Sequence, residues 1–134
     1  MIDPIVLIEL TNLKASGQLV QLAAHPYLGM KPEWVGELAE HEDHVMRWYL
    51  ASNPTLVNHP EILQKLATDE DPAVRSLLAR NPAIANYPEI IERLCTDDEW
   101  PVRWYLALNP AIPARTANTQ SLQPQPTTKR APSI

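Results

Sequence analysis

The sequence predicts an all-α fold built from repeated helical units, and three observations support this prediction. A stretch at residues 66–82 recurs without gaps at 38–54 and again at 94–110. Each copy contains residue types that begin and end helices, and its apolar residues follow a helical spacing. A fixed period of about 20 to 50 residues is typical of arrays whose units bury their apolar faces against one another. We therefore predict a helical-repeat solenoid.

Several positions of the repeat hold the same residue type in all three copies. Among them are Pro32, Pro60 and Pro88; Arg47, Arg75 and Arg103; Leu50, Leu78 and Leu106; Asn53, Asn81 and Asn109; and Pro54, Pro82 and Pro110.

The period sets the expected domain boundaries. We predict one helical repeat domain over residues 1–113, made of about four 28-residue units. The regular repeats span 32–59, 60–87 and 88–113. Residues 4–31 align only loosely with them and are expected to form a degenerate N-terminal cap, because a terminal unit has to meet water on its outer face.

Each unit is predicted to hold two helices. The first spans residues 60–67 in the middle copy and opens on Pro60, where the missing N–H costs nothing. The second follows Asp71, whose carboxylate can accept from the free amides of the first turn, with Pro72 at the first helical position.

The second helix has an apolar stripe and a defined end. Val74, Leu77 and Leu78 follow one another at i, i+3 and i+4, so they share one face. Asn81 precedes Pro82, and a residue before proline is disfavoured in the helical conformation. We expect Asn81 to end this helix and to cap the short turn that follows.

The acidic loop and the second helix carry a family resemblance. Residues 69–75 read Asp-Glu-Asp-Pro-Ala-Val-Arg, and residues 78–82 read Leu-Ala-Arg-Asn-Pro. This run resembles the leucine-rich repeat variant family, and its Val-Arg core is similar to the second helix of HEAT repeats. The resemblance covers residues 31–112 and implies a right-handed superhelix with short 3₁₀ segments. Some family members hold an iron–sulfur centre in a cysteine cluster, which Cys95 alone cannot supply, and the 28-residue period exceeds the usual family unit of about 24.

Composition limits the classes of protein that fit. A chain of 134 residues with 45% apolar residues suits one domain. The single cysteine excludes an internal disulfide framework and fits a reducing compartment. No apolar run approaches the length that a membrane span needs, and the start of the chain is acidic rather than basic, so we expect no membrane span and no signal peptide. We predict a cytoplasmic, bacterial-type protein.

Residues 114–134 differ from the rest of the chain. They are rich in Thr, Gln and Pro, hold three of the 11 basic residues and hold none of the 16 acidic ones. We predict a flexible tail here, which would leave the outer face of the last repeat without a successor. The other residues carry eight basic and 16 acidic groups, a formal charge of −8, which disfavours nonspecific nucleic-acid binding.

Three arginines each follow an acidic residue by four positions. The pairs are Asp43 with Arg47, Asp71 with Arg75, and Glu99 with Arg103. Acid-first pairs at i and i+4 favour an ion pair on a helix, so we predict a structural ladder, which could also tie neighbouring repeats together. The alternative, a row of arginines that binds anions, is disfavoured by the nearby acids.

The face of the second helix opposite its buried stripe holds the candidate binding residues. They are Trp48, Arg80, Trp100, Trp104 and Leu108. Large aromatic side chains are enriched at interaction hot spots, so we predict a partner or dimer surface. The alternative is that the tryptophans pack against the first helices or the tail.

Other conspicuous residues have structural interpretations. Trp34, Tyr49 and Tyr105 share their register with core positions, and Cys95 aligns with alanines, so we expect all four to be buried. Residues 40–44 read Glu-His-Glu-Asp-His, which collects metal-ligand types. The same loop lacks histidine in the other copies, so we expect a capping loop and no metal.

No nucleophile and base pair, phosphate-binding glycine loop or pair of buried carboxylates is evident, so we predict no enzyme activity and no cofactor. The main hypothesis is a non-catalytic adaptor that binds a protein through the outward aromatic residues and the uncovered last repeat, with a homodimer through that repeat as one form. The alternatives are a HEAT-like nucleic-acid-binding protein and an acidic mimic of nucleic acid.

Overall fold

The structure is a computed structural model that describes residues 3–113. Eight α-helices and three 3₁₀ segments make up this part of the chain, which contains no strand. In chain order they are α1 (Pro4–Ala15), α2 (Leu19–Ala23), η1 (Leu28–Met30), α3 (Pro32–Ala39), α4 (His44–Ala51), η2 (Pro54–Asn58), α5 (Pro60–Ala67), α6 (Pro72–Ala79), η3 (Pro82–Ile84), α7 (Pro88–Cys95) and α8 (Trp100–Ala107). The all-α prediction is confirmed over these residues, whereas the predicted tail at 114–134 lies outside them.

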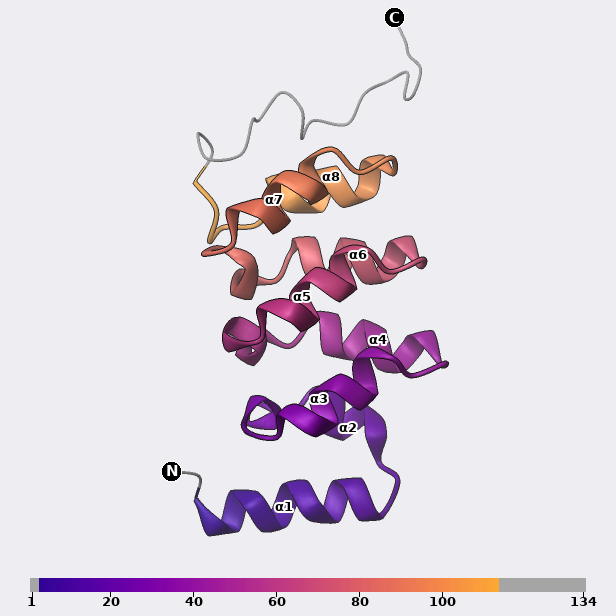
Figure 1. Ribbon diagram of the computed structural model, residues 1–134, viewed down its shortest axis with the longest axis vertical. Helices are drawn as coiled ribbons and strands as arrows, with labels where there is room; N and C mark the ends of the chain where they lie inside the picture. The colour runs from indigo at the N-terminus through magenta and orange to yellow at the C-terminus, as the bar shows by residue number, and fades with distance from the viewer. Residues whose placement is uncertain (1–2, 114–134) are drawn as a thin grey trace, which may run out of the picture.

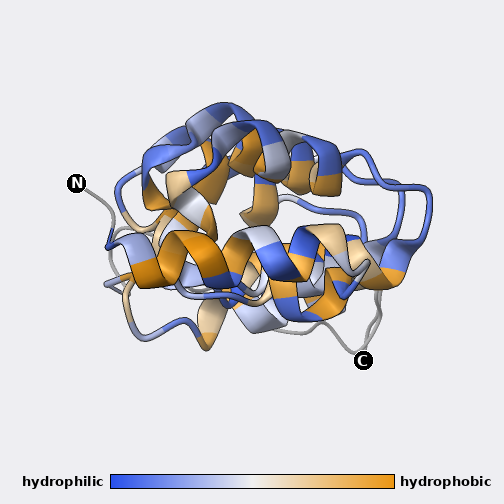
Figure 2. Cartoon of the chain, turned by 90° about the horizontal axis from the view of Figure 1, so that it is seen from below, coloured by the Kyte–Doolittle hydropathy of each residue, from blue (hydrophilic) through white to orange (hydrophobic). Residues whose placement is uncertain are grey.

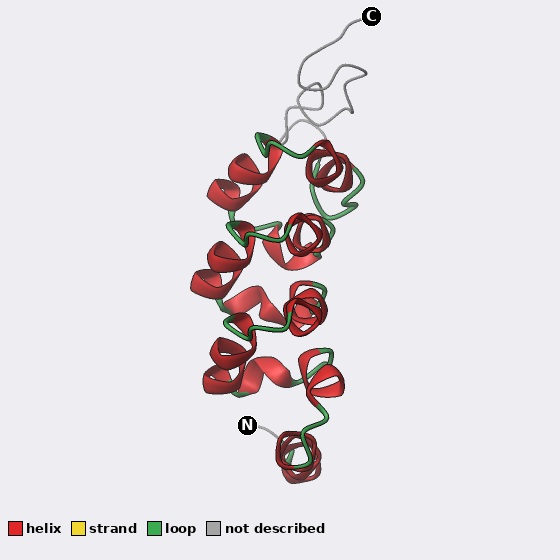
Figure 3. Ribbon diagram, turned by 90° about the vertical axis from the view of Figure 1, so that its right-hand side faces the viewer, coloured by secondary structure: helices red, strands yellow, loops and turns green. Residues whose placement is uncertain are grey.

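The helices stack along the long axis of the molecule in columns (Figure 1). Helices α3, α5 and α7 follow one another on one side, and α2, α4, α6 and α8 follow one another on the other side (Figure 3). The three 3₁₀ segments also contact one another in order. Because α3, α5 and α7 begin at positions 32, 60 and 88, and α4, α6 and α8 at positions 44, 72 and 100, both series are evenly spaced. Each of these helices therefore packs against its counterpart in the neighbouring unit.

The helix boundaries follow from local residues. Asp43 and Asp71 have extended backbones, and their carboxylates accept hydrogen bonds from the Val45 and Ala73 amides at 3.0 and 2.9 Å. Proline opens α3, α5, α6 and α7 in the first turn, where no N–H is needed. The predicted helix over residues 60–67 and the predicted start at Pro72 both agree with the structure.

The apolar core lies between the two helix columns. Leu50, Leu63, Leu78 and Leu94 are fully buried, and they come from both columns. Figure 2 shows apolar residues facing the space between the columns, whereas α1 at the end of the stack also presents apolar residues outward. Each helix of the regular repeats contacts both the other helix of its own unit and its counterpart in a neighbouring unit, so the core is continuous along the stack.

A row of buried asparagines connects consecutive units. Asn81 is 3% exposed and donates its side-chain N–H groups to the carbonyls of Ala51 and Asn53, at 2.8 and 2.9 Å. Its side-chain oxygen accepts from the Ala83 amide at 2.8 Å and so caps η3. Asn53 and Asn109 make the same three contacts, two to carbonyls of the preceding unit and one from the amide of their own turn. One side chain thus ends a helix, begins a turn and fixes the preceding unit.

The first unit departs from this pattern. The position of the asparagine holds His25, whose Nδ1 accepts from the Tyr27 amide at 3.0 Å and whose Nε2 lies 3.2 Å from Glu9. His25 therefore keeps the capping contact but bonds within its own unit. The assignment of residues 4–31 as a degenerate N-terminal cap stays a prediction.

Removal of one buried asparagine should destabilise the whole array. Asn81→Ala deletes three hydrogen bonds and leaves the Ala51 carbonyl without this donor, whereas the Asn53 carbonyl keeps the Leu56 amide at 3.4 Å. We expect the free energy of unfolding to fall by about 2–4 kcal/mol. Urea titration followed by circular dichroism measures this change. Asn86→Ala is the matched control, because Asn86 is exposed; an equal loss in both variants would contradict the role assigned to Asn81.

Candidate protein-binding surface

A shallow and largely apolar groove crosses α4, α6 and α8. It has a volume of about 350 Å³. We call it the α6 groove, because four of its six lining residues lie on or next to that helix. The lining residues are Trp48, Ala73, Ser76, Leu77, Arg80 and Tyr105.

The two aromatic walls of the α6 groove are held in place. Trp48 packs against the core and donates its indole N–H to Asp71 at 2.8 Å, and the ring of His44 lies against it with the ring centroids 4.7 Å apart. On the other wall, the guanidinium of Arg80 lies over the Tyr105 ring at 5.2 Å. A groove with fixed walls loses little conformational entropy when a ligand enters.

Helix α8 carries a separate apolar strip. Trp100, Trp104 and Leu108 follow one another at intervals of four residues, so they lie along one side of the helix. Trp100 is 44% exposed and Leu108 is 54% exposed, whereas Trp104 is half-buried. We call these three residues the α8 strip. Of the five predicted binding residues, Arg80, Trp100 and Leu108 are exposed, and Trp48 and Trp104 are half-buried.

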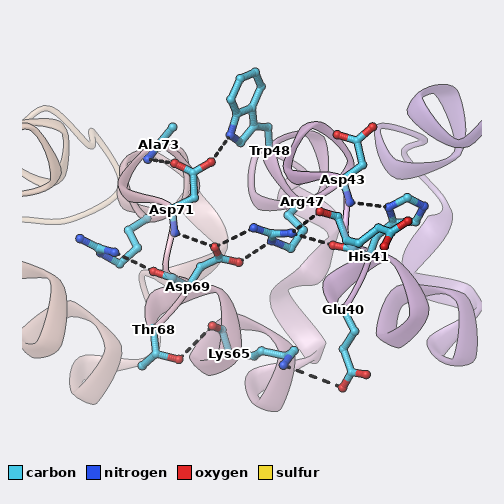
Figure 4. Close-up of polar contacts among 12 residues, drawn as sticks. Glu40, His41, Asp43, Arg47, Trp48, Lys65, Thr68, Asp69, Asp71 and Ala73 are labelled. Atoms are coloured by element: carbon cyan, nitrogen blue, oxygen red, sulfur yellow. Dashed lines mark hydrogen bonds and ion pairs between the residues drawn. The ribbon is translucent and has the colours of Figure 1, made fainter.

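Two of the three arginines form ion pairs between units, and Figure 4 shows the pair of Arg47 with Asp69. Arg47 donates to both carboxylate oxygens of Asp69, at 2.7 and 3.2 Å, and to the carbonyl of His41 at 2.6 Å. Arg75 repeats the arrangement with Asp97, at 2.7 and 3.1 Å. Both aspartate side chains are 8% exposed. Bidentate pairs with this little exposure are stronger and more specific than surface ion pairs.

The predicted i, i+4 partners of these arginines are therefore wrong. Arg47 bonds Asp69 instead of Asp43, and Arg75 bonds Asp97 instead of Asp71. The reason is that Asp43 and Asp71 are helix caps, so their carboxylates turn toward the backbone amides. Glu99 makes no side-chain cap and no ion pair with Arg103 among the described residues. Arg47 and Arg75 connect neighbouring repeats through Asp69 and Asp97, which the predicted ladder did not include.

Arg103 is the third member of the row and differs from the others. Its Nη1 donates to the carbonyl of Asp97, as Arg75 donates to the carbonyl of Asp69. Among residues 3–113 no carboxylate pairs with it, and the sequence contains no Asp or Glu after Glu99. The side chain is half-buried.

Burial and hydrogen bonds act in opposite directions on the pKa values of Asp71 and Arg47. Burial alone would raise the pKa of Asp71, but hydrogen bonds from the Trp48 indole and the Ala73 amide lower it below its usual value, assisted by His44 and Arg47. The hydrogen bond to Asp69 raises the pKa of Arg47 against the opposing effect of burial. The carboxylate of Asp71 is therefore kept charged beside the α6 groove.

A polar cleft of about 660 Å³ borders the Arg47 pair between two acidic loops. The Arg47 guanidinium and the Asp69 carboxylate are bonded to each other, and the other charged residues that line the cleft are mostly acidic, namely Glu40, Glu42 and Glu70 beside Lys65. His41 accepts from the Asp43 amide at 3.0 Å, and His44 lies against Trp48. No group of three His, Cys, Asp or Glu side chains within residues 3–113 is arranged to hold a metal ion.

The remaining predicted core residues have mixed outcomes. Trp34 and Tyr105 are half-buried against the core, but Tyr49 is 42% exposed, so its assignment to the core is wrong. Tyr49 lies one position before the buried Leu50 and falls at the edge of the apolar stripe. Cys95 is half-buried, and burial together with Glu92 raises the pKa of its thiol.

Sequence reasoning missed Asp69, Asp97 and the α6 groove. The two aspartates occupy the same position in consecutive repeats, and this recurrence was the available signal. Over residues 3–113, no helix is both long and apolar enough to cross a membrane. Comparison with protein-family models, with curated proteins and with solved structures gives no match to this chain.

The hydrogen bond between Trp48 and Asp71 should contribute a pH-dependent part of the stability. The pKa of Asp71 is lower in the folded protein than in the unfolded chain, where it is near 3.8. The contribution of Asp71 to the free energy of unfolding is therefore complete above the unfolded pKa and is lost as the pH falls through the folded pKa. We expect Trp48→Phe to lower the free energy of unfolding by about 1 kcal/mol at pH 7, with the difference from the parent shrinking below about pH 4.

Urea titrations between pH 7 and pH 2.5 measure this difference. Trp104→Phe is the control, since Trp104 occupies the same position in α8 and its indole N–H has no acceptor among residues 3–113. If the free energy of unfolding of Trp48→Phe stays below that of the parent by the same amount at every pH, the loss comes from packing and not from the hydrogen bond to the Asp71 carboxylate.

Proposed function

We propose that the chain is a non-catalytic adaptor that binds another protein through the α6 groove and the α8 strip. We further propose that it is a right-handed solenoid of about four 28-residue units, related to the leucine-rich repeat variant family and similar to HEAT repeats. The equal offsets of the helices and the repeated asparagine contacts support the solenoid. The single cysteine supports a cytoplasmic location, and the family resemblance supports a bacterial origin.

The observation that carries the proposal is the apolar surface that the second helices leave open at two places, the α6 groove and the α8 strip. The α6 groove has aromatic walls at Trp48 and Tyr105, and Trp100 and Leu108 lie exposed on the neighbouring helix. Rigid aromatic groups beside an arginine are the composition of interaction hot spots. A pocket this shallow, without a nucleophile or base, favours a protein surface over a small substrate.

The ion pairs argue against the nucleic-acid alternative. Arg47 and Arg75 each bond an aspartate, so neither guanidinium is available to a phosphate. The formal charge of −8 outside residues 114–134 opposes a polyanion further. A homodimer through the last repeat remains part of the proposal, and light scattering of the full chain against concentration tests it.

Photocrosslinking identifies the surface in use. A benzophenone side chain at Ser76, inside the α6 groove, should crosslink to a partner protein. The same group at Glu92, an exposed position on α7, should not crosslink to that protein. Mass spectrometry then identifies the partner, which is purified for a direct binding measurement.

With the purified partner, Trp100→Ala should weaken binding by about tenfold or more, the usual loss at a hot spot, while the helical circular dichroism signal is unchanged. Tyr27→Ala is the matched control, because Tyr27 is 51% exposed at the other end of the molecule. Equal binding by the parent and Trp100→Ala, or equal losses in both variants, would remove the α8 strip from the proposal.

A further inference from the structure

Helices α4 and α8 share five consecutive residues. Residues 47–51 and residues 103–107 both read Arg-Trp-Tyr-Leu-Ala. The two segments occupy the same place in their units, since α4 spans His44–Ala51 and α8 spans Trp100–Ala107. Their surroundings differ, because α4 is followed by another unit and α8 is followed by residues 114–134.

In α4, the first two of these residues bind the acidic loop of the next unit. Arg47 holds Asp69 through a bidentate pair, and Trp48 donates its indole N–H to Asp71 at 2.8 Å. Figure 4 shows both side chains reaching the same loop, with the amide of Asp71 also bonded to Asp69. The Arg-Trp pair therefore recognises two aspartates that are separated by one residue.

In α8, the same pair has no such loop to bind. One repeat period after Asp97 and Glu99 the chain holds Gln125 and Thr127, and no acidic residue follows Glu99. Within residues 3–113, Arg103 donates only to the carbonyl of Asp97, and the Trp104 indole N–H has no acceptor. Within residues 3–113, the Nε and Nη2 atoms of Arg103 make no hydrogen bond, and these are the atoms with which Arg47 holds Asp69.

We propose that Arg103 and Trp104 form a docking site for an Asp-x-Asp loop at the start of a helix in a partner protein. This inference rests on the proposed function and names the chemistry that the partner presents. One carboxylate pairs with the Arg103 guanidinium, and the second, two residues later, accepts the Trp104 indole N–H. The exposed side chains of Trp100 and Leu108 supply apolar contact beside them.

The acidic residues near Arg103 do not prevent this pairing. Arg103 lies beside its own loop of Asp97, Asp98 and Glu99. Arg75 lies beside the equally acidic loop at residues 69–71 and still binds Asp97. The local geometry of a bidentate pair outweighs the screened repulsion from exposed neighbours.

We assign the Asp-x-Asp loop to a different protein, and not to residues 114–134 or to a second copy of the chain, for two reasons. Residues 114–134 contain no Asp or Glu side chain, so they cannot supply the loop. In a second copy of the chain, Asp69 and Asp71 are already held by Arg47 and Trp48, and Asp97 is held by Arg75. A partner with an unoccupied acidic loop fits the site without breaking a contact.

A fluorescent peptide with the sequence of residues 66–80 is the probe, because it contains the Asp-x-Asp loop and the start of the following helix. Its binding to the full chain is measured by anisotropy. The expected result is that the parent chain binds it and that a peptide with both aspartates changed to asparagine binds at least about tenfold more weakly, since hydrogen bonds to charged groups are lost.

The variants assign this binding to α8. Arg103→Gln should weaken peptide binding by about tenfold or more. Arg103→Lys should weaken it less, because the ammonium keeps the charge but not the bidentate geometry. Trp104→Phe should weaken it by about two- to tenfold. Arg93→Gln is the charge-matched control, an exposed arginine on α7, and should bind as the parent does. Circular dichroism and urea titration establish that each variant is folded.

Several outcomes would overturn the proposal. One is that the peptide does not bind at millimolar concentration. Others are that Arg103→Gln binds the peptide as well as the parent does, or that Arg103→Gln and Arg93→Gln lose binding equally. Self-association of the chain that Arg103→Gln abolishes would assign the site to a second copy. If the peptide does not bind but Trp100→Ala still weakens binding of the purified partner, the proposed docking site is wrong and the proposed adaptor function is kept.

Discussion

The hydrogen bonds of the buried asparagines are the contacts on which the rest of the structure depends. Each of Asn53, Asn81 and Asn109 is almost completely buried and donates to two carbonyls of the preceding unit. Buried amides tolerate little displacement, because a lost partner leaves an unsatisfied polar group. They therefore set the separation of neighbouring units. That separation brings each inner arginine within reach of the next acidic loop and places the α6 groove between Trp48 and Tyr105.

Much of the fold could be predicted because its boundaries depend on neighbours in sequence. Proline at the first helical position, Asp71 as a cap and Asn81 before Pro82 act over four residues or fewer, and the structure follows them. The repeat period added the order of the elements. The relation to the leucine-rich repeat variant family stays a prediction.

The candidate site was less predictable, because it depends on distances between units. A helical spacing of four residues made Asp43 the obvious partner of Arg47, yet helix capping competes for that carboxylate, and the loop 22 residues ahead supplies the ion pair. The exposure of Tyr49 and the partial burial of Trp48 likewise depend on how adjacent units meet. Sequence periodicity identifies which residues are equivalent, but it does not show which of them touch.

The buried asparagines all donate in the same direction along the chain. Every asparagine amide reaches back to carbonyls that precede it by 28 or 30 residues, whereas the arginines reach forward by 22. During synthesis on the ribosome, each new asparagine therefore meets acceptors that have already emerged. A guanidinium whose loop has yet to be made stays hydrated at the surface. The chain can thus fold unit by unit from its N-terminus without enclosing a donor that lacks its acceptor.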